Sequence, residues 1–428
     1  MQTQKTPRSR QIVAAVIGNA LEWYDFVVFG FLTVIISRLF FPTQSEFASL
    51  LLTMATFGVG FFMRPVGGIV LGLYADRKGR KAALQLIIGL MTLSMAMIAF
   101  APPYAAIGVA APLLMVLARF LQGFATGGEF ASATSFLVEA APAGRRGYYG
   151  SLQMVGQSLA ALTGALAAAL VTRGLTPEQV DSWGWRLPFM FGLIIGPVGL
   201  YIRRHLEETE AFLEARRTPS AVPPAGRSLA AHADRMLVSF GLVICATIAY
   251  YVVLVYMPTF ARTQLGIPLA DAFTAQVIGL LCLTAVIPLC GALSDRVGRK
   301  PVLLAATVAL FVLLLPLFHW VLASPTLTRL AVMQGVLCSV VGVYFGPIST
   351  ALAEQFPTGF RSTGLAIAYN FAVMLFGGFA QFIVTWLIQV TGSSLAPAYY
   401  VMFGAAVGLT ASLFLIELHR DPHLPKSL

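Results

Sequence analysis

The chain has 428 residues, of which 58% are hydrophobic and only 11% carry a charge, and its formal net charge is +10. A soluble domain is about 25% charged, so this composition excludes an ordinary soluble protein and indicates that lipid surrounds most of the chain. The phosphate-binding pattern GxxxxGK[ST] is absent, which excludes an ATP-driven pump for this chain alone. The four cysteines lie singly inside apolar runs, without a CxxC pair or a His cluster, so we expect neither a metal site nor a disulfide.

Apolar stretches long enough to cross a bilayer as helices recur along the chain. The first six occupy residues 12–39, 47–73, 82–101, 106–138, 148–173 and 185–204. A polar segment rich in charge, Pro and Ala follows at 205–234, and six more apolar stretches come after it, at 235–261, 272–292, 301–322, 328–353, 363–391 and 397–418. We therefore expect an all-α membrane protein with twelve transmembrane helices in two six-helix halves, residues 1–204 and 235–428, joined by a cytoplasmic linker at 205–234.

Basic residues are distributed unevenly between the two sides of this predicted bundle. If the N-terminus is cytoplasmic, most of the 28 Lys and Arg residues fall in cytoplasmic segments, whereas the opposite loops and helix ends hold Arg38, Arg173, Arg262 and Arg329. Cytoplasmic loops of membrane proteins carry an excess of Lys and Arg. The pattern predicts that both termini are cytoplasmic and that the net charge reflects membrane topology, with no role for nucleic acid.

Two short loop motifs occur twice, in the same order. GLYADRKGRK at 72–81 matches GALSDRVGRK at 291–300, and each lies between the second and third apolar stretch of its half. EAAPAGRR at 139–146 matches EQFPTGFR at 354–361, each between the fourth and fifth stretch. Two pairs in register predict that the halves are structural repeats of each other.

These motifs resemble those of the major facilitator superfamily. GNALEWYDFVVFG at 18–30, FFMRPVGG at 61–68, RFLQGFATGGE at 119–129 and WGWRLPF at 183–189 narrow the resemblance to the bacterial metabolite:proton symporters. Members of that family carry citrate, tricarballylate, 2-oxoglutarate, dicarboxylates, shikimate, or proline and betaine, and the stretch from 40 to 68 looks closest to the citrate and tricarballylate members. The resemblance implies a multi-pass protein of the bacterial inner membrane.

The first apolar stretch carries Asn19, Glu22 and Asp25 at three-residue spacing, which places them on one stripe of a helix. Charged residues inside a membrane are costly and usually functional. A buried carboxylate favours its neutral form and a nearby cation favours its charged form, so Glu22 and Asp25 are candidates for carrying the coupling proton. Two other roles stay open, namely hydration of a polar cavity and pairing with an arginine during helix packing.

Arg119 lies among apolar residues in the middle of the fourth stretch. Its planar fork suits a substrate carboxylate, and an ion pair with Glu22 or Asp25 is the alternative. Glu129 is ten residues further on, so it is either a second titrating site or a helix-pairing group. Arg64 precedes Pro65 and contacts either substrate or another helix.

The second half is poor in buried charge, since its acids lie near helix ends. The candidate substrate ligands are therefore neutral and are, in the two halves together, Gln153, Gln157, Tyr250, Tyr251, Tyr256, Tyr344, Tyr369, Asn370 and Gln381. Tyrosine in a membrane protein is often an interface anchor instead. His319, beside Trp320 near a helix end, is expected to be interfacial. The asymmetry suggests that the first half handles protons and the second half shapes the ligand site.

The resemblance implies that the repeated loop motifs latch the cytoplasmic side while the carrier is open outward. The alternative is that their basic residues only obey the charge bias of cytoplasmic loops. The expected gating residues are Asp76, Arg80, Glu139, Arg146, Asp295, Arg299, Glu354 and Arg361.

The leading hypothesis is therefore a transporter, not an enzyme, that takes up a small organic acid together with protons by alternating access. Citrate or a related tri- or dicarboxylate is the expected substrate, the proton is the coupling ion, no cofactor is expected, and the chain is expected to act as a monomer. A zwitterion such as proline or betaine is the first alternative, because Trp23 and Tyr24 offer aromatic faces to a cation. A drug efflux antiporter and a non-transporting sensor are weaker alternatives.

Overall fold

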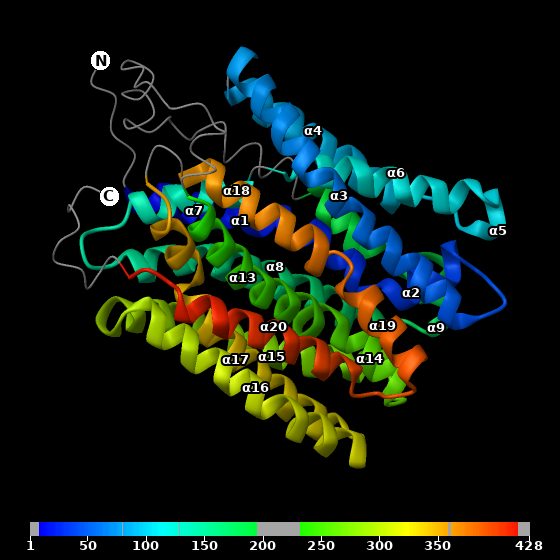
Figure 1. Cartoon of the computed structure of the whole chain (residues 1–428). Coiled ribbons are helices and arrows are strands. Elements are labelled where there is room, and N and C mark those ends of the chain that lie inside the picture. The colour runs from blue at the N-terminus through cyan, green and yellow to red at the C-terminus, as the bar shows by residue number, and fades with distance from the viewer. Residues whose placement is uncertain (1–7, 79, 128, 195–231, 358–360, 418–428) are drawn as a thin grey trace.

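The computed structural model describes residues 8–78, 80–127, 129–194, 232–357 and 361–417. Every element in this part of the chain is a helix, and most of the helices run along one common direction. The bundle in Figure 1 has two ends, one holding α7 and the other holding α5, α9 and α14. We call the first the basic end, because it contains Arg299 and Arg361, and the second the far end.

The first half consists of ten elements followed by helical residues 186–194. They are α1 (Arg8–Phe31), α2 (Thr33–Phe40), α3 (Glu46–Lys78), α4 (Arg80–Ala99), α5 (Tyr104–Ile107), α6 (Ala110–Ala125), α7 (Glu129–Glu139), α8 (Arg146–Gly174), α9 (Pro177–Gln179) and the π-helix η1 (Val180–Gly184).

The second half contains two further π-helical segments, each inside a long span. Its elements are α13 (Ala233–Ala249), η2 (Tyr250–Tyr256), α14 (Met257–Gln264), α15 (Leu269–Val297), α16 (Arg299–Ala323), α17 (Leu327–Glu354), α18 (Arg361–Ala372), η3 (Val373–Gly377), α19 (Ala380–Thr391) and α20 (Ala396–Leu413). Most of the predicted 205–234 segment lies outside the described residues.

The apolar stretches of the sequence coincide with these helices. Nine described helices are long and apolar enough to cross a membrane, and α1 with α2 adds a tenth span that is bent by 63°. The shorter α4 and the helix that begins at residue 186 occupy the remaining two stretches. The predicted all-helical membrane fold is therefore confirmed. At the bend between α1 and α2, Leu32 has φ −86° and ψ 11°, and the Thr33 hydroxyl donates to the Gly30 carbonyl at 2.8 Å.

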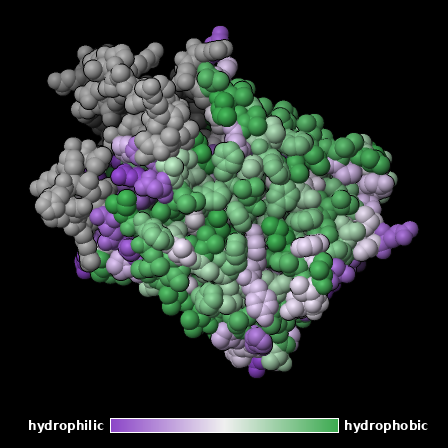
Figure 2. All heavy atoms as spheres, viewed as in Figure 1, coloured by the Kyte–Doolittle hydropathy of each residue, from purple (hydrophilic) through white to green (hydrophobic). Residues whose placement is uncertain are grey.

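The surface of the bundle is apolar over a broad area, with hydrophilic residues gathered toward its ends (Figure 2). Large side chains such as Leu170 and Leu289 are 73% and 69% exposed. Exposed apolar area of this extent is unfavourable in water and favourable against lipid chains.

The two halves meet mainly where α8 packs along α15 and α17, and where α3 meets α18 and α19. Small residues allow the close approach of α8 and α15. A Cβ atom on Gly291 would lie 2.8 Å from the Gly147 carbonyl oxygen, so a larger residue at 291 would push the two helices apart. Further along, the hydroxyls of Ser158 and Thr284 are 2.6 Å apart. Any site between the halves is therefore enclosed by tightly packed helices.

Candidate functional site

Asn19, Glu22 and Asp25 all lie buried on α1, facing the interior of the bundle. The Asn19 amide donates to the Gln153 carbonyl oxygen at 2.9 Å, and the Gln153 side chain donates back to Asn19 at 3.2 Å. Gly156 makes room for this pair, because a Cβ there would lie 2.7 Å from the Asn19 amide nitrogen. Asn19 and Gln153 thus join α1 to α8 within the first half.

Arg119 is completely buried on α6. Its guanidinium lies over the Phe29 ring, with Cζ 3.8 Å from the centroid, and one Nη donates to the Gln122 side chain. Nε and Nη2 have no hydrogen-bond partner among the described residues. A buried charged donor without a partner costs about 1–3 kcal/mol or more, so this fork is suited to an additional acceptor.

Asp25 is 6% exposed, and its Oδ1 accepts no hydrogen bond from the described part of the chain. Its charge interacts favourably with that of Arg119 and unfavourably with that of Glu22. The protonation of Asp25 therefore depends on both neighbours. Whatever neutralises Arg119 changes the balance between the charged and neutral forms of Asp25.

Arg64 is 3% exposed and lies on α3 inside a cage of aromatic rings. Its Cζ atom is 5.1 Å from the Trp23 centroid and 4.5 Å from each of the Phe26 and Phe61 centroids. Its Nε lacks a partner among the residues that the structure describes. Cation–π contacts stabilise the guanidinium here, and its Nε keeps one in-plane donor available.

A small cavity of about 10 Å³ lies between the halves beside this cage. Glu22 and Arg64 line it from the first half, and Tyr369 and Asn370 line it from α18 of the second half. Tyr369 stacks on Phe130, with centroids 3.7 Å apart, and the Asn370 amide donates to the Gly127 carbonyl at 2.7 Å. The structure thus brings four predicted residues to one point, with room for about one water molecule.

Further buried polar groups, which do not line this cavity, also lack hydrogen-bond partners among the described residues. They are the hydroxyls of Tyr250 and Tyr251, the amide nitrogen of Gln157 and both amide atoms of Gln381. Tyr250 lies 5.8 Å from Trp23 and Tyr251 lies 5.4 Å from Phe61, measured between ring centroids. Both tyrosines belong to η2, and π-helical segments are frequent at functional sites.

Two other predicted ligands are placed differently. The Tyr344 hydroxyl donates to the Leu242 carbonyl at 2.8 Å, which is a contact within the second half. The backbone of Glu129 begins α7, but its side chain lies outside the described residues.

Sequence analysis missed Phe26, Phe61, Gln122, Thr126 and Phe130, which lie around Arg64 and Arg119. Two of these residues could have been found from their spacing along the sequence relative to residues that were predicted. Phe26 follows Trp23 by three positions and Gln122 follows Arg119 by three, so each pair shares a helix face.

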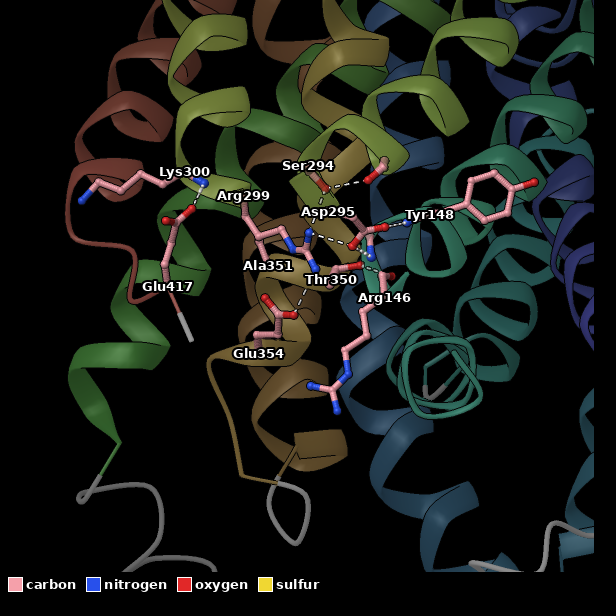
Figure 3. A network of polar contacts seen from close by, with 12 residues as sticks. Arg146, Tyr148, Ser294, Asp295, Arg299, Lys300, Thr350, Ala351, Glu354 and Glu417 are labelled. Atoms are coloured by element: carbon pink, nitrogen blue, oxygen red, sulfur yellow. Dashed lines mark hydrogen bonds and ion pairs between the residues drawn. The ribbon is translucent and has the colours of Figure 1, made fainter. Parts of the chain in front are cut away.

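The basic end is closed by a polar network, shown in Figure 3. The carboxylate of Asp295 accepts the backbone N–H groups of Gly147 at 2.7 Å and Tyr148 at 2.9 Å, in the first turn of α8. Arg299 pairs with Asp295 at 2.9 Å and with Glu354 at 3.4 Å. A carboxylate of the second half thus caps a helix of the first half, where the helix dipole favours negative charge.

A second ion pair crosses between the halves at the same end. Arg361 on α18 binds Glu139 on α7 at 2.9 Å and donates to the Ala353 carbonyl at 2.9 Å. The Thr350 hydroxyl donates to the backbone carbonyl of Arg146 at 2.9 Å. The predicted gating residue Arg146 therefore joins this contact between the halves through its backbone.

The side chains of Asp76 and Arg80 lie outside the described residues, at the end of α3 and the start of α4. Their predicted role as gating residues remains a prediction.

The far end is closed more lightly. Arg173 on α8 pairs with Asp271 on α15 at 3.0 Å, and both side chains are substantially exposed. Phe31 packs against Phe273 nearby. Contacts between the two halves therefore lie on both sides of the small central cavity.

A membrane bundle of two halves, with buried charges between them and contacts that close either end, has the design of an alternating-access transporter. The profile of the Major Facilitator Superfamily matches residues 15–380. The chain therefore belongs to this superfamily, as its loop motifs predict.

Curated relatives narrow the family further. The citrate-proton symporter of Salmonella typhi is 37% identical over 408 residues, which cover 94% of this chain and 93% of the relative. The ectoine/proline transporter ProP of Corynebacterium glutamicum is 35% identical, covering 96% of this chain and 85% of the relative. The proline/betaine transporter of Escherichia coli K12 is 33% identical, covering 96% and 84%. The protein is thus a metabolite:proton symporter of the major facilitator superfamily and not an enzyme.

Solved structures agree on the fold. A crystal structure of a D-xylose-proton symporter superposes with a TM-score of 0.75, covering 95% of this chain and 97% of that one at 20% identity. At this identity the likeness concerns the arrangement of helices alone.

Proposed function

We propose that the protein takes up a small organic acid, most simply citrate or a related tri- or dicarboxylate, together with protons. The observation that carries this proposal is the pair of buried arginines at the centre of the bundle. Arg64 and Arg119 each keep at least one donor without a hydrogen-bond partner among the described residues. A ligand with more than one carboxylate offers an acceptor to each guanidinium, which a neutral ligand does not.

The proposed coupling runs through the acids on α1. The positive charge of Arg119 stabilises the ionised form of the Asp25 carboxylate, while burial and the charge of Glu22 oppose that form. When a substrate carboxylate binds Arg119, that stabilisation weakens and a proton on Asp25 or Glu22 becomes more favourable. Substrate and proton would then enter together and leave together.

The proposed cycle is a rocking of the two halves about the central site. Opening the far end requires breaking the Arg173–Asp271 pair, and opening the basic end requires breaking the Asp295 and Arg361 contacts. We assign the basic end to the cytoplasm on the basis of its Lys and Arg content.

A zwitterion such as proline or betaine is the second candidate, because the relatives include transporters named for these compounds. A quaternary ammonium needs open aromatic faces. In this chain the Arg64 guanidinium already lies against Trp23, Phe26 and Phe61. The positive charge in that cage disfavours a second cation, and this supports the organic acid.

Uptake by proteoliposomes tests the proposal. Vesicles containing the purified protein should accumulate labelled citrate when the outside is acidic, and an uncoupler should abolish the accumulation. Labelled proline and betaine, applied to the same vesicles, test the second candidate. Accumulation of these compounds without citrate uptake would refute the organic-acid proposal, and citrate flux that ignores the pH gradient at fixed voltage would refute proton coupling.

A further inference from the structure

A second pocket lies at the far end of the bundle, separate from the central cavity. Its volume is about 360 Å³, within the range of small-ligand sites. Glu46 and Leu50 of α3 line it from the first half, and residues of α14 and α19 line it from the second. The pocket therefore straddles the two halves, like the central site.

The chemistry of this pocket is that of a site for a small carboxylate. Arg262, in the last turn of α14, supplies an exposed guanidinium, and Thr263, Gln264 and Gln389 supply neutral polar groups. Thr259 lines the pocket and is 1% exposed, and its hydroxyl has no hydrogen-bond partner in the described part of the chain. A buried hydroxyl without a partner is unfavourable, so a ligand oxygen that reached it would be stabilised.

Polar groups continue from the pocket toward the central site. On α19, Gln381, Thr385 and Gln389 follow one another at four-residue spacing and so share one face. The Thr385 hydroxyl donates to the Tyr256 hydroxyl at 3.0 Å, and both residues line the pocket.

Closer to the centre, Gln381 is completely buried with both amide atoms unpartnered among the described residues. The Tyr251 hydroxyl on η2 is also buried and has no hydrogen-bond partner among the described residues. Tyr256 and Thr385 thus separate two groups of available polar atoms.

We propose that this pocket is an outer vestibule site, in which Arg262 binds a carboxylate of the incoming substrate before it passes Tyr256 and Thr385 to the centre. The inference rests on the proposed function, because it takes an organic acid as the substrate and the far end as external. Citrate carries enough carboxylates to contact Arg262 with one of them and the hydroxyl of Thr259 with another.

Glu46, which lines the pocket from the first half, would give the vestibule selectivity. Its carboxylate repels a polyanion, so the vestibule holds citrate weakly and releases it inward. For a zwitterion the same carboxylate would be attractive. Replacing Glu46 by Gln should therefore lower the external half-saturation concentration for citrate, and it would raise that for proline if proline is carried.

The main test compares Arg262→Gln with Arg329→Gln. Arg329 is a matched control, since it also lies at the far end but contacts Trp320, outside the pocket. Labelled citrate uptake is measured over a range of concentrations in right-side-out membrane vesicles, where the far end faces the bath, and in inverted vesicles. We expect Arg262→Gln to raise the half-saturation concentration at least threefold in right-side-out vesicles only, with the maximal rate within twofold of wild type. Arg262→Lys, which keeps the charge, should show a smaller effect.

An unchanged half-saturation concentration in Arg262→Gln, an equal effect in Arg329→Gln, or an equal effect in inverted vesicles would each overturn the vestibule proposal. A fall in the maximal rate alone would also overturn it, because it would indicate a role in gating or folding. Failure of the proposed function looks different, since wild-type vesicles would then take up no citrate at all. If they carry proline instead, the same variants are assayed with labelled proline, whose carboxylate tests Arg262 in the same way.

Discussion

At the scale of single residues, the site consists of charges whose neighbours leave them incompletely paired. Arg119 has one side-chain acceptor, Gln122, and two donor nitrogens with none in the described chain. Asp25 interacts electrostatically with Arg119 but accepts no hydrogen bond from these donors. Folding tolerates such groups at a cost, and their joint presence at one point is the strongest sign of function in the molecule.

Replacing Arg119 by Lys should weaken binding of citrate more than tenfold. A compact ammonium cannot reproduce the planar fork of guanidinium donors, and each hydrogen bond to a charged group that is lost costs about 1.5–3 kcal/mol. Titration calorimetry on purified protein measures the effect, with Arg329→Lys as a control that alters an exposed far-end arginine. Normal citrate affinity in Arg119→Lys would mean that this residue serves only helix packing.

Replacing Asp25 by Asn should separate exchange from accumulation. An amide cannot take up and release the coupling proton, so gradient-driven citrate uptake should vanish while counterflow across proteoliposomes persists. Glu22→Gln, measured in parallel, identifies which of the two acids carries the proton. Equal loss of counterflow and accumulation in Asp25→Asn would place this residue in substrate binding instead.

At the scale of elements, the sequence was most informative where the signal was local. Hydrophobic stretches located the helices, and the repeated loop motifs located the polar contacts of Asp295, Arg299, Glu354 and Arg361 at the basic end. The π-helical segment η2 was not predictable, because the run of tyrosine and valine that forms it contains neither Gly nor Pro. The aromatic cage of Arg64 was not predictable either, since it depends on how α1 packs against α3.

Replacing Asp295 by Asn should loosen the basic end without altering the central site. The carboxylate accepts two backbone N–H groups of α8 and pairs with Arg299, whereas an amide offers only one acceptor oxygen and no charge. Hydrogen bonds to charged groups contribute about 1.5–3 kcal/mol, so the open fraction at this end should rise about tenfold or more. A cysteine introduced at Ser135, which faces Ser362 across the two halves, reports opening through its rate of maleimide labelling.

The same variant should transport more slowly and keep its citrate affinity within tenfold of wild type. Ser158→Ala, which removes a hydroxyl from the α8–α15 contact away from this network, is the control. Unchanged labelling in Asp295→Asn, or loss of citrate binding in a folded protein, would show that the network does not act as a latch.

At the scale of the whole molecule, the two closures differ in strength. At the basic end, the largely buried Asp295 carboxylate accepts two backbone N–H groups of the other half, and Arg361 and Glu139, whose side chains are 6% and 47% exposed, pair across the halves. At the far end, the Arg173 and Asp271 side chains are 53% and 37% exposed. A hydrogen bond to a charged group contributes about 1.5–3 kcal/mol, while an exposed ion pair contributes about 0–1 kcal/mol. Without substrate, the bundle should therefore open more readily at its far end, the end proposed to face the outside.

Charge reversal across the far end tests this asymmetry. Arg173→Asp should place two acids side by side, and Asp271→Arg should place two bases side by side. The reporter is a cysteine that replaces Phe273. Each charge reversal should raise its labelling rate by at most about fivefold, which is equivalent to about 1 kcal/mol. The double variant restores opposite charges and should return the rate toward that of wild type, since a double-mutant cycle isolates the pair's own contribution. In the wild-type background, the cysteine at 273 should react faster than the one at 135. Faster labelling at 135, or a double variant no better than the singles, would mean that the far-end pair does not set the resting conformation.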